Sequence, residues 1–160
     1  MPLHLRPAVP SDAVPLADLY LRARAELAAY APLAHPEAGV RAWIANVLIP
    51  SGGVTVATED RQLLGMSAHT SADGVVWLDQ LYVCPSRKRR GIGTALLNHV
   101  KSQTPGMLQL YTFQPNLAAI AFYERHGFVA IGYGDGSENE EHCPDALYRW
   151  TRHAPTDLAD

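Results

Sequence analysis

One stretch of the chain, residues 77–97, constrains the fold most. Its apolar first part predicts a buried strand. A turn follows, with Pro85 and four consecutive Lys and Arg residues. An apolar helix is then expected to begin at Gly91 and Gly93. Backbone N–H groups at a helix start lack intrahelical partners and lie at the positive end of the helix dipole, so they bind anions well. Glycine lets a phosphate approach that backbone closely, and adjacent cations strengthen the attraction. The stretch therefore predicts a cradle for a pyrophosphate.

Length, charge and cysteine content narrow the classes of protein. A chain of 160 residues is expected to form one domain, here over residues 1–152, with a disordered tail at 153–160. The formal net charge of −3 argues against a general nucleic-acid binder, which is usually basic over a whole face. A local basic run on an acidic background favours a small anionic ligand instead. The two cysteines, Cys84 and Cys143, make neither a disulfide framework nor a zinc site, so no metal is expected.

The amino-terminal residues and the apolar runs predict the compartment. The first residues lead directly into a strand-like stretch without the apolar region of a secretory signal. No apolar run approaches the ~20 residues that a membrane-spanning helix needs. These patterns predict a cytoplasmic protein that has neither membranes nor nucleic acids as partners.

The amino-terminal half predicts two helices and a group of short strands. After an edge strand at residues 3–9, Ser11 and Asp12 are suited to cap an amphipathic helix that extends to about Leu27. A second helix is expected from about Glu37 to Leu48, ending before Pro50. Strands are expected at residues 54–58, 63–70 and 75–83. Because short turns join these three strands, they should form an antiparallel meander.

The carboxy-terminal half predicts two more helices and three more strands. The helix that begins near Gly93 separates the strand at residues 75–83 from one at 107–112, so these strands are expected to be parallel neighbours. Asn116 is suited to cap a last helix, which Gly127 would follow in the left-handed position. Two strands, at 128–133 and 146–151, flank the acidic loop at 134–141. The fold class expected from this order is mixed α/β (α+β), with a mostly antiparallel central sheet flanked by helices.

Two segments of the chain carry a resemblance to a known family. The first, at residues 81–97, contains Lys88-Arg89-Arg90-Gly91-Ile92-Gly93 and is similar to the pattern Arg/Gln-x-x-Gly-x-Gly/Ala, with Lys88 as a departure at its first position. The second, at residues 116–128, is similar to Asn-x-x-Ala-x-x-Phe-Tyr-x-x-x-Gly-Phe. With the predicted order β-α-α-β-β-β-α-β-α-β-β, the chain resembles the GNAT family of acyl-CoA-dependent N-acyltransferases over roughly residues 3–150.

The resemblance implies acetyl-CoA as co-substrate and a set of residues that bind it. The backbone N–H groups between Lys88 and Thr94 would hold the pyrophosphate, and the strand before the loop would splay from its parallel neighbour to accept the pantetheine arm. Arg87, Arg89 and Arg90 are candidates to reach the nucleotide phosphates, although a basic run is in general also compatible with a solvated turn. The expected cofactor-binding residues are Leu81, Tyr82, Val83, Lys88, Arg89, Arg90, Gly91, Ile92, Gly93, Thr94, Asn116, Ala119, Phe122 and Tyr123.

Three catalytic roles follow from the same resemblance. Tyr123 would protonate the leaving thiolate, because a phenol holds its proton at neutral pH; the alternative is an ordinary core tyrosine. The N–H of Leu81 would polarise the thioester carbonyl. Asp79 is the first candidate for the general base, and the alternation of residues 77, 79, 81 and 83 places it on one strand face with Leu81. A carboxylate with a purely structural role remains an equal alternative.

The acceptor side is less specified. Glu140, Glu141 and His142 are the next candidates for the base, and a water chain without one essential base would also serve. The acidic loop at 134–141 is expected to line the acceptor cleft together with Glu26, Tyr30 and His35, unless it is simply a solvated loop. Asn116 has two compatible roles, as helix cap and as cofactor ligand.

The function expected from the resemblance is N-acetyl transfer. An acetyl group would move from acetyl-CoA to a primary amine of a small molecule by direct attack through a tetrahedral intermediate, without a covalent enzyme intermediate. The alternatives are a peptide N-terminus as acceptor, a longer acyl donor, or a non-catalytic module that binds acyl-CoA. Pairing of edge strands makes a homodimer possible.

Overall fold

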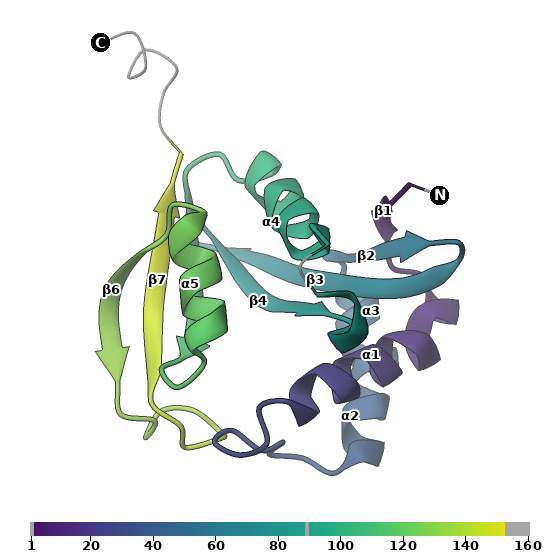
Figure 1. Cartoon of the computed structure of the whole chain (residues 1–160), viewed down its shortest axis with the longest axis horizontal. Helices are drawn as coiled ribbons and strands as arrows, with labels where there is room; N and C mark the ends of the chain where they lie inside the picture. The colour runs from purple at the N-terminus through teal and green to yellow at the C-terminus, as the bar shows by residue number, and fades with distance from the viewer. Residues whose placement is uncertain (1, 89, 153–160) are drawn as a thin grey trace, which may run out of the picture.

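A seven-stranded sheet in the order β1-β2-β3-β4-β5-β7-β6 forms the centre of the computed structural model, which describes residues 2–88 and 90–152 (Figure 1). The strands are β1 (His4–Pro7), β2 (Val54–Glu59), β3 (Gln62–Ala72), β4 (Val75–Val83), β5 (Met107–Phe113), β6 (Val129–Gly134) and β7 (Asp145–Thr151). The helices are α1 (Ala13–Ala25), α2 (Glu37–Trp43), α3 (Ile49–Ser51), α4 (Ile92–Ser102) and α5 (Leu117–Arg125). The predicted mixed α/β fold with a mostly antiparallel sheet is confirmed. The tail predicted at 153–160 lies outside the described residues.

The meander of β2, β3 and β4 and the parallel pairing of β4 with β5 agree with the prediction. Strands β4 and β5 pair only at their beginnings, where the last partners are Trp77 and Gln109. Beyond that point β4 stays with β3 as far as the pair Val83–Gly65, and β5 stays with β7 as far as Phe113–Asp145. The sheet therefore opens into a V between β4 and β5, as the family resemblance implied.

A β-bulge in β4 corrects one prediction. Ala68 of β3 faces Gln80, whereas the next residue, His69, faces Leu78, so Asp79 is an extra residue in β4. A bulge reverses the alternation of side chains beyond it. Trp77 and Asp79 consequently lie on one face of the sheet, while Leu81 packs with the residues of the opposite face. The prediction that residues 77, 79, 81 and 83 share one face is wrong for this reason.

The second predicted helix does not end before Pro50. After α2 the chain forms a π-helical turn over Ile44–Leu48 and continues into α3, which includes Pro50 and ends at Ser51. In the wide turn the N–H of Ile49 donates to the carbonyl of Ile44, five residues earlier. Proline lacks an N–H and clashes with a carbonyl in a regular helix, and the wider turn accommodates it.

Each face of the sheet carries its own apolar core. Helices α1 and α2 cover one face, and α4 and α5 cover the other (Figure 1). Gly65 of β3 brings the start of α4 close to the sheet, because a Cβ there would lie only 2.9 Å from Cγ2 of Ile92. Gly65 pairs with Val83, so this close contact fixes the start of α4 beside the end of β4. None of the helices in the described part of the chain is long and apolar enough to cross a membrane.

Candidate active site

The start of α4 presents free backbone donors. Gly91 caps this 11-residue helix with φ +81°, a left-handed conformation that glycine adopts without a steric penalty. The first intrahelical bond runs from the N–H of Ala95 to the carbonyl of Gly91, at 3.0 Å. Within the described part of the chain, the N–H groups of Ile92, Gly93 and Thr94 have no hydrogen-bond acceptor. Three adjacent donors at a helix start fit a pyrophosphate.

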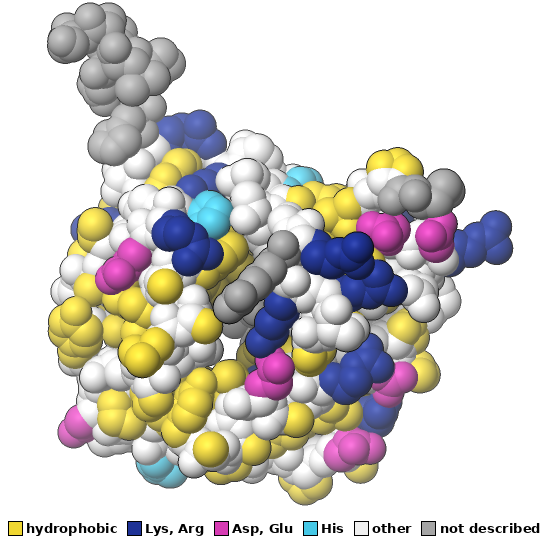
Figure 2. Space-filling view, in the orientation of Figure 1, with side chains coloured by type: hydrophobic (Ala, Val, Ile, Leu, Met, Phe, Trp, Pro, Cys, Tyr) yellow, Lys and Arg dark blue, Asp and Glu magenta, His cyan; other side chains and the backbone are white. Residues whose placement is uncertain are grey.

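Cations surround this helix start. Arg87, Lys88 and Arg90 precede it in the loop, and the predicted contribution of Arg89 lies outside the described residues. Lys88 forms an ion pair with Glu26, which follows α1. Figure 2 shows Lys and Arg side chains gathered beside a hollow in the surface, in the part of the view where Figure 1 draws the start of α4 and the end of α1. The charge and the free donors together favour an anionic ligand.

The end of β4, the start of α4 and the middle of α5 converge near this hollow. A Cβ at Gly93 would lie 3.4 Å from Cζ of Phe122 and 3.6 Å from Cγ2 of Val83, so glycine leaves room between the two helices and the strand. Phe122 also packs against an apolar cluster on this face of the sheet, which contains Tyr123 and against which Leu81 and Ala119 pack as well. Because β4 has left β5 at this point, its free edge lies next to these side chains.

Tyr123 is buried within this cluster. Its ring packs edge-on against Phe122 and Phe128, with centroid separations of 5.3 and 5.5 Å. No hydrogen bond from a described residue contributes to the protonation of its hydroxyl. Burial raises the pKa of Tyr123 above its ordinary value, and the nearby phenol of Tyr82 adds to the effect. The hydroxyl therefore stays protonated at neutral pH, as a general acid requires.

Two other predicted residues have their side chains occupied elsewhere. Asn116 caps α5, because its side-chain oxygen accepts the N–H of Ala119 at 3.2 Å. The Tyr82 side chain packs on the α1 face of the sheet, where its ring meets that of Tyr20 at 5.1 Å. For Tyr82, contact with a ligand in the V between β4 and β5 would thus involve the main chain.

Asp79 lies at the bulge, just beyond the last residue of β4 that pairs with β5. Its carboxylate accepts the hydroxyl proton of Thr70 at 2.8 Å, and the residue is exposed. Partial desolvation raises the pKa of Asp79 above the ordinary value for aspartate, while the Thr70 hydrogen bond opposes the shift. A carboxylate with a raised pKa is a better proton acceptor than an ordinary aspartate.

Thr70→Val tests whether Asp79 acts as the base. The hydrogen bond from Thr70 stabilises the charged carboxylate, so its loss raises the pKa of Asp79 further. A base works only when deprotonated, and the acid limb of the pH profile of kcat/KM should therefore move to higher pH. Thr55→Val, in β2, is the matched control and should leave the limb in place. An acid limb that stays put in Thr70→Val would exclude Asp79 as the titrating base.

Sequence reasoning missed Arg24 in the last turn of α1. The residue is 6% exposed, and its Nη2 donates to the carbonyl of Ala31 at 3.0 Å and to Glu141 at 3.4 Å. Its guanidinium also lies 6.0 Å from the ring centroid of Phe113 in β5. The sequence held one signal, because Arg24 is four residues after Tyr20 and so shares the apolar stripe of α1. Arg24 links the β6–β7 loop to α1, and Glu141 is thereby ion-paired instead of free to act as a base.

The loops that were predicted to line the acceptor cleft do meet. His35, before α2, contacts Glu140 of the β6–β7 loop at 2.7 Å. A groove of about 650 Å³ lies beside this loop, on β5, β6 and β7. Glu138 and Glu141 line it, whereas Glu26, Tyr30 and His35 do not. Within residues 2–88 and 90–152, no three His, Cys, Asp or Glu side chains are grouped to hold a metal ion.

Comparison with known proteins identifies the family. The model of the acetyltransferase (GNAT) family matches residues 20–128, which include all of β4, α4 and α5. The chain belongs to this family. The peptidyl-lysine N-acetyltransferase YiaC of Escherichia coli is 37% identical over 92 residues, which are 58% of this chain and 59% of that protein. The comparisons confirm the predicted family and support the predicted class of enzyme, an acyltransferase.

Solved structures of this family share the fold. The PaiA N-acetyltransferase of Thermoplasma acidophilum, in complex with coenzyme A, has a TM-score of 0.72 at 18% identity, with 95% of this chain and 100% of that chain covered. The ribosomal-protein-S18-alanine N-acetyltransferase of Escherichia coli has a TM-score of 0.73 at 17% identity, with coverage of 96% and 97%. At these identities the likeness concerns the fold of the GNAT family.

Proposed function

We propose that this GNAT protein transfers the acetyl group of acetyl-CoA to a primary amine by direct attack. The observation that carries the proposal is the meeting of three features: N–H groups at the start of α4 without an acceptor among the described residues, the edge of β4 that does not pair with β5 beyond Trp77, and the hydroxyl of the buried residue Tyr123. Acetyl-CoA supplies the activated acetyl thioester. The pyrophosphate fits the N–H groups of residues 92–94, and the pantetheine arm fits the edge of β4 at Leu81–Val83.

The remaining steps are assigned to side-chain and main-chain groups of this protein. Acyl transfer needs a deprotonated amine, a polarised carbonyl and a proton for the leaving sulfur. Asp79 accepts a proton from the amine, directly or through water, and the main-chain N–H of Leu81 polarises the thioester carbonyl. The amine nitrogen forms the new bond to the carbonyl carbon, the carbon–sulfur bond breaks, and Tyr123 gives its proton to the sulfur. No covalent intermediate on the protein is required.

The acceptor is the least specified part of the proposal. A primary amine of a small molecule is the first candidate, as expected from the family resemblance. A lysine side chain in a protein is the second candidate, favoured by the similarity to a peptidyl-lysine N-acetyltransferase. A peptide N-terminus is supported only by fold likeness to an alanine N-acetyltransferase, so it ranks lower.

Release of free thiol from acetyl-CoA tests the proposed function. The protein is incubated with acetyl-CoA and a panel of amino acids, polyamines, aminoglycosides and lysine-containing peptides, and thiol release is compared with the acetylated product found by mass spectrometry. We expect equal amounts of thiol and N-acetylated amine for at least one acceptor class. A protein that binds acetyl-CoA but acetylates no member of the panel would instead be the non-catalytic acyl-CoA-binding module.

A further inference from the structure

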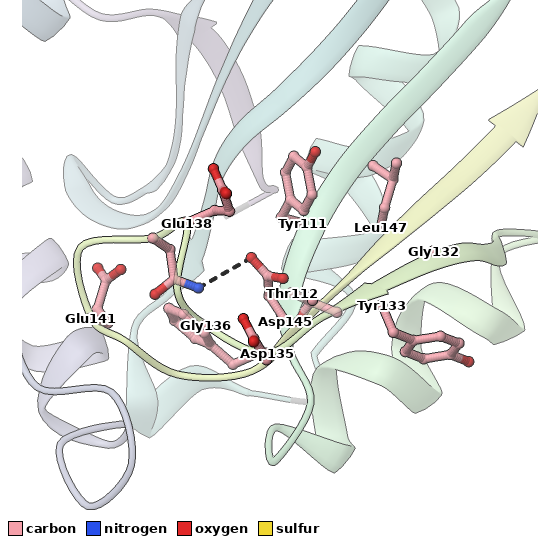
Figure 3. Close-up of a pocket in the computed structure, with 13 residues that line it drawn as sticks. Tyr111, Thr112, Gly132, Tyr133, Asp135, Gly136, Glu138, Glu141, Asp145 and Leu147 are labelled. Carbon is pink, nitrogen blue, oxygen red and sulfur yellow. Dashed lines mark hydrogen bonds between the residues drawn. The ribbon is translucent and has the colours of Figure 1, made fainter.

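The groove on β5, β6 and β7 is a consequence of glycines in β6. Leu147 of β7 pairs with Tyr111 of β5 on one side and with Gly132 of β6 on the other. Asp145 likewise faces Gly134, where a Cβ would lie 2.5 Å from its carboxylate oxygen. Figure 3 shows Tyr111 and Leu147 pointing to the same side of the sheet, while Tyr133 points to the other. Because β6 contributes no side chains at these two positions, the sheet surface is hollow here, and the β6–β7 loop forms a wall.

Carboxylates dominate this groove. Asp135, Glu138, Glu141 and Asp145 line it, and no Lys, Arg or His is among its lining residues. Of the four, Glu141 alone has a cationic partner in the described part of the chain, Arg24. Asp145 accepts a hydrogen bond from Asn139 at 3.2 Å (Figure 3). Asp135 accepts the N–H of Ser137 at 2.9 Å. Neutral donors leave these negative charges uncompensated, so the groove attracts cations.

The groove begins beside the proposed reaction centre. Tyr111, 60% exposed, stacks on Trp77 with centroids 5.6 Å apart and planes 9° apart. Trp77 is the last residue of β4 that pairs with β5, and it shares its sheet face with Asp79. An exposed aromatic face also attracts a cation directly. Two cations lie near the groove: Arg149 of β7 donates to Gln109, and Arg24 is paired with Glu141. Neither is part of the lining.

We infer that the groove binds a second cationic group of the acceptor, an ammonium or guanidinium that accompanies the amine to be acetylated. The inference rests on the proposed function and names its substrate class: acceptors with at least two positive charges. A diamine and a lysine that is flanked by a basic residue share this chemistry. The reacting amine would lie near Asp79 and the second cation over Tyr111, between the carboxylates of the β6–β7 loop.

Paired acceptors test the inference. The values of kcat/KM are compared within two pairs of acceptors, each with one monocationic and one dicationic member. The first pair is butylamine and putrescine, and the second is a blocked lysine amide and the same lysine flanked by arginine. Both pairs are measured at low and at high ionic strength. We expect the dicationic member to be preferred, and the preference to shrink as salt screens the exposed charges. A preference in the amine pair alone identifies a small polyamine, and a preference in the peptide pair alone identifies a basic peptide; either result supports the inference.

Glu138→Gln assigns the preference to the groove. Glu138 is exposed and forms no ion pair in the described residues, so its replacement should not disturb the fold. We expect the preference for the dication to fall about twofold to fivefold, the effect of one exposed ion pair, with the monoamine unaffected. Glu59→Gln, in β2 at the far end of the sheet, should change neither value. Acetylation without a preference for dications would overturn the inference. An equal loss of kcat/KM for both acceptors in Glu138→Gln would overturn it as well. Absence of any acetylation would overturn the proposed function itself.

Discussion

Tyr123→Phe is expected to lower kcat by about a hundredfold to ten-thousandfold, the usual contribution of a general acid. The substitution removes the hydroxyl that is proposed to protonate the leaving sulfur, and it keeps the ring that packs against Phe122 and Phe128. The affinity for coenzyme A, measured by calorimetry, should stay nearly unchanged because the proposed pyrophosphate site lies at the start of α4.

Tyr148→Phe is the matched control for that experiment. Tyr148 is a second buried tyrosine of the same apolar cluster, and its hydroxyl donates to Glu124 at 3.2 Å. Its loss removes a hydrogen bond worth about 1 kcal/mol and should lower the stability without a matching loss of kcat. Equal kcat values for Tyr123→Phe and the wild type would exclude Tyr123 as the general acid and leave it as a core residue.

Gly91→Ala is expected to weaken coenzyme A binding about fivefold to thirtyfold. Gly91 has φ +81° and caps α4, and a Cβ there meets no atom within 4 Å, so the cost is conformational and not steric crowding. An L-residue in the left-handed region costs about 1–2 kcal/mol. A helix start that changes shape to avoid this strain has to regain its original shape when coenzyme A binds, so the affinity falls. Gly91→Asn should lose less affinity, because asparagine tolerates this conformation. Calorimetric titration with coenzyme A measures the effect.

Gly74→Ala separates local strain from loss of the binding site. Gly74 has φ +79°, and a Cβ there also meets no atom within 4 Å, but it lies in the turn between β3 and β4. Its replacement should lower stability by a similar amount and leave the dissociation constant unaltered. Unchanged binding in Gly91→Ala, or equally weakened binding in Gly74→Ala, would contradict the assignment of the phosphate to the start of α4.

The strand pairing and the helix ends were predicted well because they depend on residues that are close together in the sequence. Short turns between β2, β3 and β4 require antiparallel pairing, and the helix between β4 and β5 favours a parallel pair. The helix start near Gly91 and Gly93 and the cap function of Asn116 follow equally from their immediate neighbours. The π-helical turn before Pro50 was missed, because a regular helix cannot accommodate this proline and a local widening is hard to recognise in sequence.

The parts that sequence could not predict depend on pairing across the sheet. The bulge at Asp79 arises from the register of β4 against β3, and strict alternation along β4 gave the wrong face. The groove needs Gly132 and Gly134 to face Leu147 and Asp145, which are more than ten residues away in the chain. The pairing of Arg24 with Glu141 joins segments from opposite ends of the chain. The residues proposed for the donor side therefore follow from contiguous motifs, whereas the groove and the Arg24–Glu141 pair do not.

A crystal structure of the protein with coenzyme A tests the central claim most directly. We predict that the pyrophosphate accepts hydrogen bonds from the N–H groups of Ile92, Gly93 and Thr94, that the pantetheine arm lies along Leu81–Val83, and that the sulfur lies within hydrogen-bond distance of the Tyr123 hydroxyl. A pyrophosphate bound away from the start of α4, or a sulfur beyond the reach of Tyr123, would contradict the proposed mechanism.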